Sequence, residues 1–168
     1  AVGHKRARKA FEAAQSSVGC TEGPDAAKVE LRMLLENYDG KLQQCEEIMI
    51  VIESLCSQIP EVEELLKIKG IGLVTVAGIF AEIGDIRRFD SPRQIQKLAG
   101  LAIAENSSGK HKGQTGISKR GRARLRAILF LAALSLVRSN PEFRKLHNYY
   151  TTREINPLKK KQSIIAMC

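Results

Sequence analysis

Two short segments of the chain carry residue types that could hold a phosphate group. The first is Ile68-Lys69-Gly70-Ile71-Gly72, where glycines two positions apart allow a tight reversal and leave backbone N–H groups uncovered. Such amides at the start of a helix bind phosphate without reading bases, and Lys69 and Thr75 would add to the contact. The pattern therefore predicts a helix-hairpin-helix that binds a DNA backbone. A purely structural turn between two helices is the alternative.

The second segment places serines in a cationic run. Ser107-Ser108-Gly109-Lys110-His111-Lys112 is followed by Gly116-Ile117-Ser118-Lys119-Arg120-Gly121, and the spacing is not that of a phosphate-binding P-loop. A serine hydroxyl attacks a phosphodiester when a base takes its proton or cations stabilise the transition state. The available helpers are Lys110, His111, Lys112 and Arg120. On the residues alone, a polar loop serine and an exposed loop histidine without chemical roles are the more frequent outcome.

The positive charge of the chain is concentrated around the second segment. The formal net charge is +9, and no acidic residue lies between Glu105 and Glu142. Such a patch indicates a polyanionic partner, with DNA as the first candidate. The residues that we predict to bind DNA are Lys69, Gly70, Ile71, Gly72, Thr75, Lys110, Lys112, Lys119, Arg120, Arg122 and Arg126.

The elements that must position these segments are predicted to be helices, so the expected fold class is all-α, without a sheet. Residues 2–18 are expected to end a preceding helix. From Leu31 to Ile59, apolar or thiol side chains recur in alternating steps of four and three, the heptad seam of a coiled coil. We favour pairing of this seam between chains over its packing on the chain's own domain.

Short helices are expected in the part that follows the seam. We predict helices over 61–67 after Pro60, over 73–83, and from Pro92 to about Ala99, with Gly100 ending the last. The β-branched run 74–76 would also suit a strand. Small side chains at positions 77, 78 and 81 favour a closely packed helix instead.

The remaining elements are predicted from caps and breakers. Ser91 with Gln94 is expected to cap the helix at Pro92, and Ser118 is expected to cap a long helix that ends before Asn140-Pro141. Residues 106–116 are expected to be a loop, and two helices are expected after Asn140. The predicted buried stripe of the long helix comprises Leu125, Ile128, Leu129, Ala132 and Leu136.

The cysteine spacing argues against a metal-binding protein, and the apolar runs argue against a membrane protein or a secreted protein. The four cysteines form no C-x-x-C pair and have no histidine at ligand spacing, so no metal site is predicted and reduced thiols are expected. The longest apolar stretch, 127–137, is too short for a membrane span, and no signal-peptide pattern is present. The chain starts without methionine, and we expect it to be part of a longer protein.

The order of these segments resembles the C-terminal half of bacterial insertion-sequence transposases related to the Piv DNA invertase. The likeness rests on the heptad arm followed by L-x-x-I-x-G-I-G, F-D-S-P-x-Q-x-x-x-x-A-G-L, S-G-K and G-I-S-K-R-G-x-x-x-L-R. It runs from about Leu31 to the end and is specific between Ile68 and Arg126. Lys69 stands where the family often has proline, and Ser107 doubles the serine.

The resemblance implies roles that the residues alone do not. In that family an N-terminal RuvC-like domain supplies acidic metal ligands, a coiled coil mediates assembly, and a bridge RNA pairs with target and donor DNA. The catalytic serine precedes glycine and corresponds to Ser108, with Ser107 and Ser118 as alternatives. Mg²⁺ is expected for the parent protein and no cofactor for this chain. The expected partners are DNA, bridge RNA and further copies of the chain, without a membrane, in the bacterial cytoplasm at the nucleoid.

The expected organisation has three parts: a linker and the end of a preceding helix over 1–28, a coiled-coil arm over 29–59, and a transposase domain over 60–168 that is truncated at its C-terminus. The chain would be the DNA-binding, serine-bearing part of a transposase that catalyses transposition and recombination of an insertion sequence. Alone it should bind DNA without cutting it. The alternatives are a non-catalytic helix-hairpin-helix module of repair or junction-binding type, and a helical assembly module that contacts guide RNA.

Overall fold

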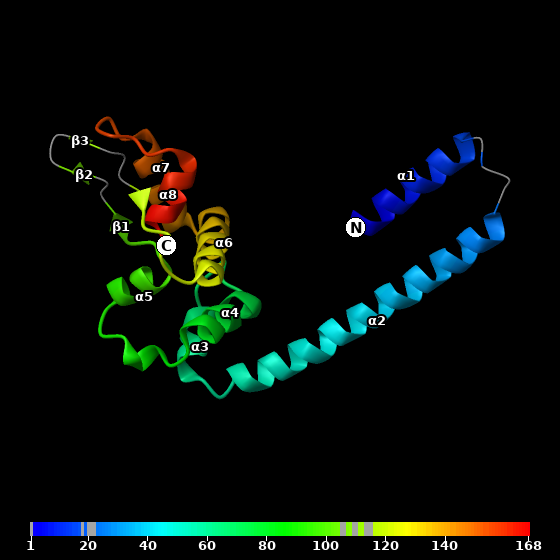
Figure 1. Ribbon diagram of the computed structural model, residues 1–168, viewed down its shortest axis with the longest axis horizontal. Helices are drawn as coiled ribbons and strands as arrows, with labels where there is room; N and C mark the ends of the chain where they lie inside the picture. The colour runs from blue at the N-terminus through cyan, green and yellow to red at the C-terminus, as the bar shows by residue number, and fades with distance from the viewer. Residues whose placement is uncertain (1, 18, 20–22, 105–106, 109–110, 113–115) are drawn as a thin grey trace. The chain divides into compact units, whose positions relative to one another are not determined.

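Helices dominate the computed structural model, so the predicted all-α class is confirmed (Figure 1). The structure describes residues 2–17, 19, 23–104, 107–108, 111–112 and 116–168; at 2, 107–108 and 111–112 it describes the backbone only. Contacts divide the chain into two units, Ala1–Ile50 and Val51–Cys168. In the described residues, no helix combines the length and apolar character needed to cross a bilayer.

The first unit consists of α1 (Val2–Ser16) and most of α2 (Pro24–Cys56). α2 begins at Pro24 rather than at position 29, because a proline in the first turn sacrifices no helical hydrogen bond. Most seam side chains in this unit are exposed, among them Leu31, Leu35, Tyr38 and Leu42, whereas Met49 is half-buried. An exposed seam is a requirement for pairing between chains, and the pairing itself stays a prediction.

The second unit holds the compact part of the chain. The short helices predicted over 61–67, 73–83 and 92–99 are confirmed to within a residue at each end. Its helices are α3 (Pro60–Leu66), α4 (Leu73–Ile83), the 3₁₀ turn η1 (Ile86–Arg88), α5 (Pro92–Leu98), α6 (Ala123–Ser139), α7 (Pro141–Thr152) and α8 (Lys160–Ala166), and its strands are β1 (Ile103–Ala104), β2 (Ser107–Ser108), β3 (His111–Lys112) and β4 (Gly116–Ile117).

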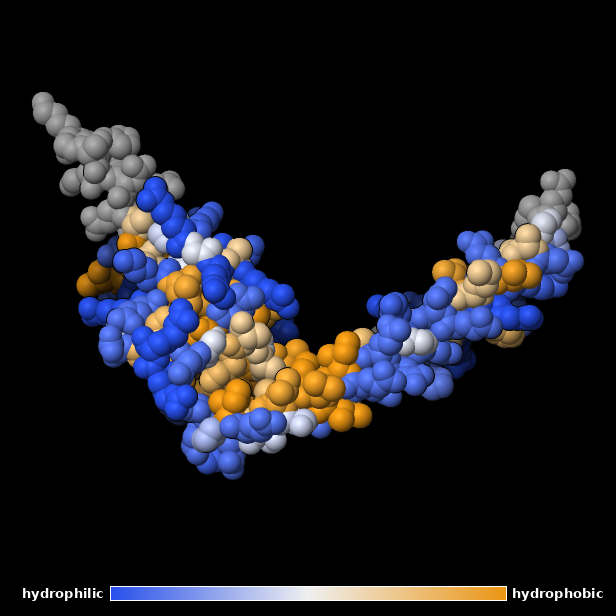
Figure 2. All heavy atoms as spheres, turned by 60° about the horizontal axis from the view of Figure 1, so that its bottom comes forward, coloured by the Kyte–Doolittle hydropathy of each residue, from blue (hydrophilic) through white to orange (hydrophobic). Residues whose placement is uncertain are grey.

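The C-terminal end of the seam packs inside the second unit. Cys56 is buried together with Val62 of α3 and Val76 of α4, and Ile52 and Ile59 lie against this cluster. For this end of the seam, packing on its own domain is therefore the correct interpretation. Figure 2 shows that hydrophobic side chains also remain on the surface around the end of α2.

α6 is the helix around which the second unit is built, since it packs against α4, α7 and α8. Of its predicted stripe, Leu125, Ala132 and Leu136 are buried. Gly78 of α4 permits the close approach of the two helices, because a Cβ there would lie 3.1 Å from Cδ1 of Ile128. This contact explains why the segment is a helix despite its β-branched start.

The predicted start of α6 at Ser118 is wrong. The helix begins at Ala123, and no side chain caps it. Lys119 and Gly121 have φ angles of 54° and 156°, which a right-handed helix cannot contain. Lys119, Arg120 and Arg122 therefore precede α6 instead of lying in its first turns.

The predicted capping box at α5 is also wrong in detail. Ser91 precedes Pro92 as expected, but its side chain makes no capping hydrogen bond. The Gln94 side chain instead accepts a hydrogen bond from the backbone N–H of Asp90 at 3.1 Å. The residue pattern located the helix start correctly and misassigned the atoms that stabilise it.

The serine segment is not a simple loop. β1 pairs antiparallel with β4, and β2 pairs antiparallel with β3, with Ser107 opposite Lys112 and Ser108 opposite His111. The expectation of no sheet is therefore wrong. Two residues separate β2 from β3 in the sequence, which is the spacing of a tight hairpin, but the polar composition suggested a loop.

The last two helices pack on each other at the end of the chain. Asn140 caps α7, because its side chain accepts a hydrogen bond from the N–H of Glu142 at 3.0 Å. His147 of α7 and Ser163 of α8 are joined by a hydrogen bond of 2.9 Å between Nδ1 and Oγ. The final helix, expected after Asn156-Pro157, begins at Lys160.

Candidate nucleic-acid interface

The loop between α3 and α4 contains the first predicted phosphate contact. Gly70 has a φ of 104°, which favours glycine, and a Cβ at this position would lie 3.0 Å from Cβ of Ser139 and 3.3 Å from the backbone oxygen of Ser135. Gly70 therefore lets the loop pack closely on the end of α6. Its role in the fold is a structural one, in addition to any role in binding.

Gly72, unlike Gly70, lies in open space. It is exposed, and in the described part of the chain no atom beyond its two neighbours lies within 4 Å of the place where its Cβ would be. Among the described residues, none accepts a hydrogen bond from the N–H of Gly72, Leu73 or Val74. Lys69 is exposed and Thr75 half-buried beside these amides. The start of α4 thus offers uncovered donors and a cation, the combination that suits a phosphate oxygen.

The segment before α6 packs tightly against the end of α5. A Cβ at Gly121 would clash with the backbone oxygen of Leu98 and would lie 2.6 Å from the nitrogen of Gly100. The N–H of Lys119 donates to the oxygen of Gly100 at 3.0 Å, and the N–H of Arg122 donates to that of Leu98 at 2.7 Å. We call these two crossing segments, 98–101 and 118–122, the glycine junction.

Two of the predicted DNA-binding arginines stabilise this region. Nη1 of Arg126 donates to the backbone oxygens of Ala99 at 2.9 Å and Lys119 at 3.4 Å, and so joins both sides of the glycine junction. Nη1 of Arg122 donates to the oxygen of Glu82 and lies 3.7 Å from its carboxylate. The guanidinium groups of Arg122 and Arg126 thus donate hydrogen bonds to backbone oxygens of the chain itself.

Lys119 and Arg120 are exposed at the glycine junction. They follow β4, which pairs with β1, and the N–H of Ser118 donates to the oxygen of Ala102 at 2.8 Å. We call the paired strands β2 and β3, which lie between β1 and β4 in the sequence and carry Ser107 and Ser108, the serine hairpin. Of the other predicted residues, Lys110 lies outside the described residues, and the side chains of Ser107, Ser108, His111 and Lys112 are not described. Ser118 is half-buried in the junction.

The predicted DNA-binding residues thus form two groups at opposite ends of α6. The α3–α4 loop contacts Ser139 at the end of the helix, while the glycine junction leads into its start at Ala123. At about 1.5 Å per residue, the two ends are about 24 Å apart. The ion pair of Glu82, near the end of α4, with Arg124 at 3.6 Å agrees with an antiparallel packing of α4 and α6.

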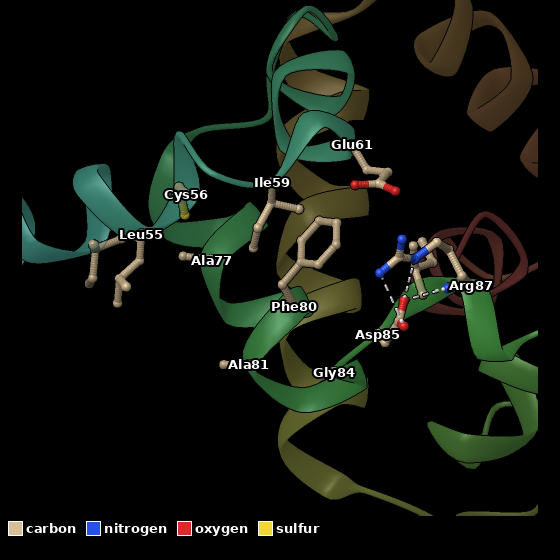
Figure 3. A pocket seen from close by; sticks show the side chains of 12 residues that line it. Leu55, Cys56, Ile59, Glu61, Ala77, Phe80, Ala81, Gly84, Asp85 and Arg87 are labelled. Carbon is tan, nitrogen blue, oxygen red and sulfur yellow. Dashed lines mark hydrogen bonds and ion pairs between the residues drawn. The ribbon is translucent and has the colours of Figure 1, made fainter.

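A separate hollow of about 500 Å³ lies between the end of α2, α4 and η1 (Figure 3). Its lining is mostly apolar, with the Phe80 ring near the middle. At its edge the Arg87 guanidinium donates to the Asp85 carboxylate at 3.0 Å, and this hydrogen bond lowers the pKa of Asp85 below its ordinary value. Glu61 also lines the hollow, so its edge carries two carboxylates, of which Asp85 is paired with Arg87.

Metal ligands were not predicted for this chain. In the part of the chain that the structure describes, no three His, Cys, Asp or Glu residues are grouped so as to hold a metal ion. Cys45 is exposed, Cys56 buried and Cys168 half-buried, and all three are free thiols. Burial raises the pKa of the Cys168 thiol to about 11.

Comparisons with known proteins match the part of the chain that contains both groups of predicted DNA-binding residues. A family model described as "Transposase IS116/IS110/IS902 family" matches residues 62–148. The transposase for insertion sequence element IS1111A of Coxiella burnetii is 37% identical over 76 residues, which are 45% of this chain and 21% of that protein. A probable family 20 transposase of Pseudomonas aeruginosa is 29% identical over 141 residues, 82% of this chain and 41% of that protein.

A third relative is also a transposase that the chain matches over part of its length. The transposase for insertion sequence element IS1328 of Yersinia enterocolitica is 31% identical over 103 residues, 61% of this chain and 31% of that protein. The chain thus matches less than half the length of each of these relatives. The family match contains the α3–α4 loop, the glycine junction and the serine hairpin.

Proposed function

This chain belongs to the IS116/IS110/IS902 transposase family, and from that membership we propose that it is the DNA-binding, serine-bearing part of an enzyme that moves an insertion sequence. The observation that carries the proposal is the placement of two groups of uncovered donors and cations at the two ends of one helix, α6. DNA is the partner that a transposase must bind.

The first DNA contact is proposed at the start of α4, in the manner of a helix-hairpin-helix. The uncovered amides of Gly72, Leu73 and Val74 bind one phosphate, and the exposed Lys69 ammonium neutralises it. These groups hold the duplex backbone and do not read sequence. The loop is a backbone clamp rather than a recognition element.

The second contact is proposed at the glycine junction. Lys119 and Arg120 lie exposed there, at the base of the serine hairpin. A phosphate held by these cations would be near the hairpin strands that carry Ser107 and Ser108. The two hydrogen bonds of Arg126 support this placement, because they join both sides of the glycine junction that leads to β4.

The proposed chemistry uses Ser108. Its hydroxyl oxygen attacks a DNA phosphorus, a serine–phosphate bond forms, and the bond from phosphorus to one deoxyribose oxygen breaks. The serine proton passes to a base and the leaving oxygen takes up a proton. Cations at the hairpin base stabilise the charge that builds up on the phosphate. Mg²⁺, bridge RNA and the recombinase relationship to Piv remain part of the proposal for the parent protein, and no step is assigned to a metal here.

The arm supports a further part of the proposal. The exposed seam of α2 in the first unit pairs with the same helix of another copy, so that two or more chains act together on DNA. Recombination joins two DNA ends, and assembly through the arm would bring two serine hairpins to them.

DNA binding by the two groups is tested by salt titration of the purified chain with a fluorescent duplex. Removing one phosphate-binding cation should reduce the slope of log K against log salt by about 0.9. We expect Lys69→Gln and Arg120→Gln each to reduce the slope by about this amount, and the double variant by about twice as much. Lys28→Gln, whose ammonium pairs with Asp25 on α2, is the control. Unchanged slopes in both site variants would reject the proposed interface.

A non-catalytic DNA-binding module is the second candidate function. The free amides at the start of α4 favour it as strongly as they favour the first, because they account for binding alone. The two candidates differ only in what Ser108 does. Loss of reaction with retained binding on Ser108→Ala would exclude the second.

A further inference from the structure

The end of α7 carries exposed aromatic and apolar side chains that neither proposed DNA contact uses. Tyr149 is 60% exposed and Ile155 is 80% exposed. Together with Arg153, Glu154 and Asn156 they line an open hollow of about 490 Å³. These residues lie beyond the segment that the family model matches, which ends at residue 148.

The hollow is held in shape by hydrogen bonds. Nε of Arg153 donates to the backbone oxygen of Asn156 at 2.8 Å, and the N–H of Leu158 donates to the oxygen of Tyr150 at 2.8 Å. Asn156 adopts a φ of 52°, a conformation that a non-glycine residue rarely takes up. The chain therefore keeps Ile155 exposed in a fixed loop. Adjacent exposed apolar side chains held in this way indicate a binding surface.

Two aromatic rings lie next to each other at the end of α7. The Tyr149 and Tyr150 ring centroids lie 5.7 Å apart with a tilt of 50°, and the Arg153 guanidinium lies 5.8 Å from the Tyr150 ring. Tyr150 thus contacts both Tyr149 and Arg153, while Tyr149 itself is 60% exposed. Unpaired bases stack on such exposed aromatic rings and on arginine planes.

Positive charge follows directly after the hollow. Lys159, Lys160 and Lys161 are exposed at the start of α8, and the hydrogen bond between His147 and Ser163 holds α8 against α7. Lys159 is three residues after Asn156, so their Cα atoms are at most about 11 Å apart. The Glu154 carboxylate in the lining repels phosphate. The hollow therefore suits a base, and the lysines suit the phosphates of the adjacent nucleic-acid backbone.

From this arrangement we infer that the end of α7 and the start of α8 form a binding site for single-stranded nucleic acid, in which an unpaired base stacks on Tyr149 beside Ile155 and the lysines bind the adjacent phosphates. The inference deepens the proposed function by adding a site for unpaired nucleotides. It depends on that proposal only in that the chain handles nucleic acid. Unpaired nucleotides are present both in a folded RNA and in DNA opened for strand exchange.

Tyrosine fluorescence gives a direct readout, because the chain has no tryptophan and only three tyrosines. We expect a single-stranded 12-nucleotide probe to quench this emission, and Tyr149→Ala to remove most of the quenching. Tyr149→Ala should weaken binding of that probe at least about fivefold, as expected when a base loses its stacking partner. Tyr149→Phe keeps the ring and should bind like the parent chain.

Controls separate this site from the duplex-binding groups. Leu146→Ala changes an exposed apolar residue on the same helix that does not line the hollow, and should bind normally. Ile155→Ala should weaken single-strand binding without affecting folding, since the side chain is 80% exposed. Duplex binding through Lys69 and Arg120 should not change in Tyr149→Ala, so failure of this inference and failure of the proposed function are distinguishable.

RNA and DNA probes of the same sequence identify the source of the unpaired nucleotide. Binding of either probe that depends on the Tyr149 ring supports the inference, and a preference for RNA would point to contacts with the 2′-hydroxyl. The inference is overturned if Tyr149→Ala and Ile155→Ala bind both probes like the parent chain. It is also overturned if Tyr149→Phe loses as much affinity as Tyr149→Ala.

Discussion

At the scale of single residues, the charged side chains near the serine hairpin do not all have the same role. Arg126 and Arg122 donate hydrogen bonds to backbone oxygens of neighbouring segments, whereas Lys119 and Arg120 are exposed. The charge of a side chain does not show, from the sequence, whether it hydrogen-bonds within the fold or is exposed for binding. The difference depends on Gly100 and Gly121, which bring the crossing backbones close enough for an arginine to reach both.

Gly121 is expected to be indispensable for the glycine junction. Gly121→Ala introduces a Cβ against Leu98 and Gly100 and places alanine at a φ of 156°. We expect it to lower the free energy of unfolding by about 2 kcal/mol or more. Urea unfolding followed by circular dichroism measures this decrease.

Gly116→Ala is the matched control for Gly121→Ala. Gly116 lies in β4, and among the described residues no atom beyond its chain neighbours lies within 4 Å of its would-be Cβ. A change within about 0.5 kcal/mol is expected. Equal effects of the two substitutions would show that the junction is not tightly packed.

At the scale of elements, the two glycines of the α3–α4 loop should separate stability from binding. Gly70→Ala meets Ser139 and Ser135 of α6 at a φ of 104°, and should cost about 1–3 kcal/mol of stability. Gly72→Ala meets nothing and should leave stability unchanged, but its methyl group lies beside the uncovered amides and should weaken duplex binding several-fold. Thermal melts and fluorescence anisotropy on both variants check this. Normal duplex binding by Gly72→Ala would contradict the proposed phosphate contact.

Helix positions were largely predictable from the sequence, because Pro60, Pro92 and Pro141 mark helix starts by local backbone chemistry. The short strands were missed since two-residue strands carry almost no hydrophobic periodicity, and only the spacing of Ser108 and His111 hinted at them. The structural use of Arg126 could not be predicted, because the acceptor of its shorter hydrogen bond, the oxygen of Ala99, lies 27 residues away in the sequence. Tyr149 was not singled out, because a tyrosine on a polar helix carries no sequence pattern that distinguishes a binding residue from a surface residue.

At the scale of the whole molecule, the exposed seam of α2 should set the oligomeric state. Leu35 lies on the heptad seam and Leu34 lies off it, yet the two are 55% and 58% exposed. Leu35→Glu should shift the mass in solution toward the 18.6 kDa monomer, while Leu34→Glu should not. Size-exclusion chromatography with light scattering measures both. A monomeric parent chain, or the same shift in both variants, would argue against the paired arm.

The distance along α6 also bears on how DNA lies on the second unit. Contacts about 24 Å apart correspond to phosphates roughly seven base pairs apart along a duplex, at about 3.4 Å per pair. The second unit would thus hold less than one helical turn, with the serine hairpin at one end of the contact.

The claim that the hairpin serine attacks DNA is tested most directly by mapping the covalent adduct in an intact transposase that contains this chain. The enzyme is incubated with a nicked donor DNA that traps the intermediate, digested with protease and analysed by mass spectrometry. We predict a DNA phosphate on Ser108, no adduct in Ser108→Ala although DNA binding is retained, and normal adduct in Ser107→Ala and Ser118→Ala. An adduct that persists in Ser108→Ala, or that maps to another residue, would contradict the proposed role of Ser108.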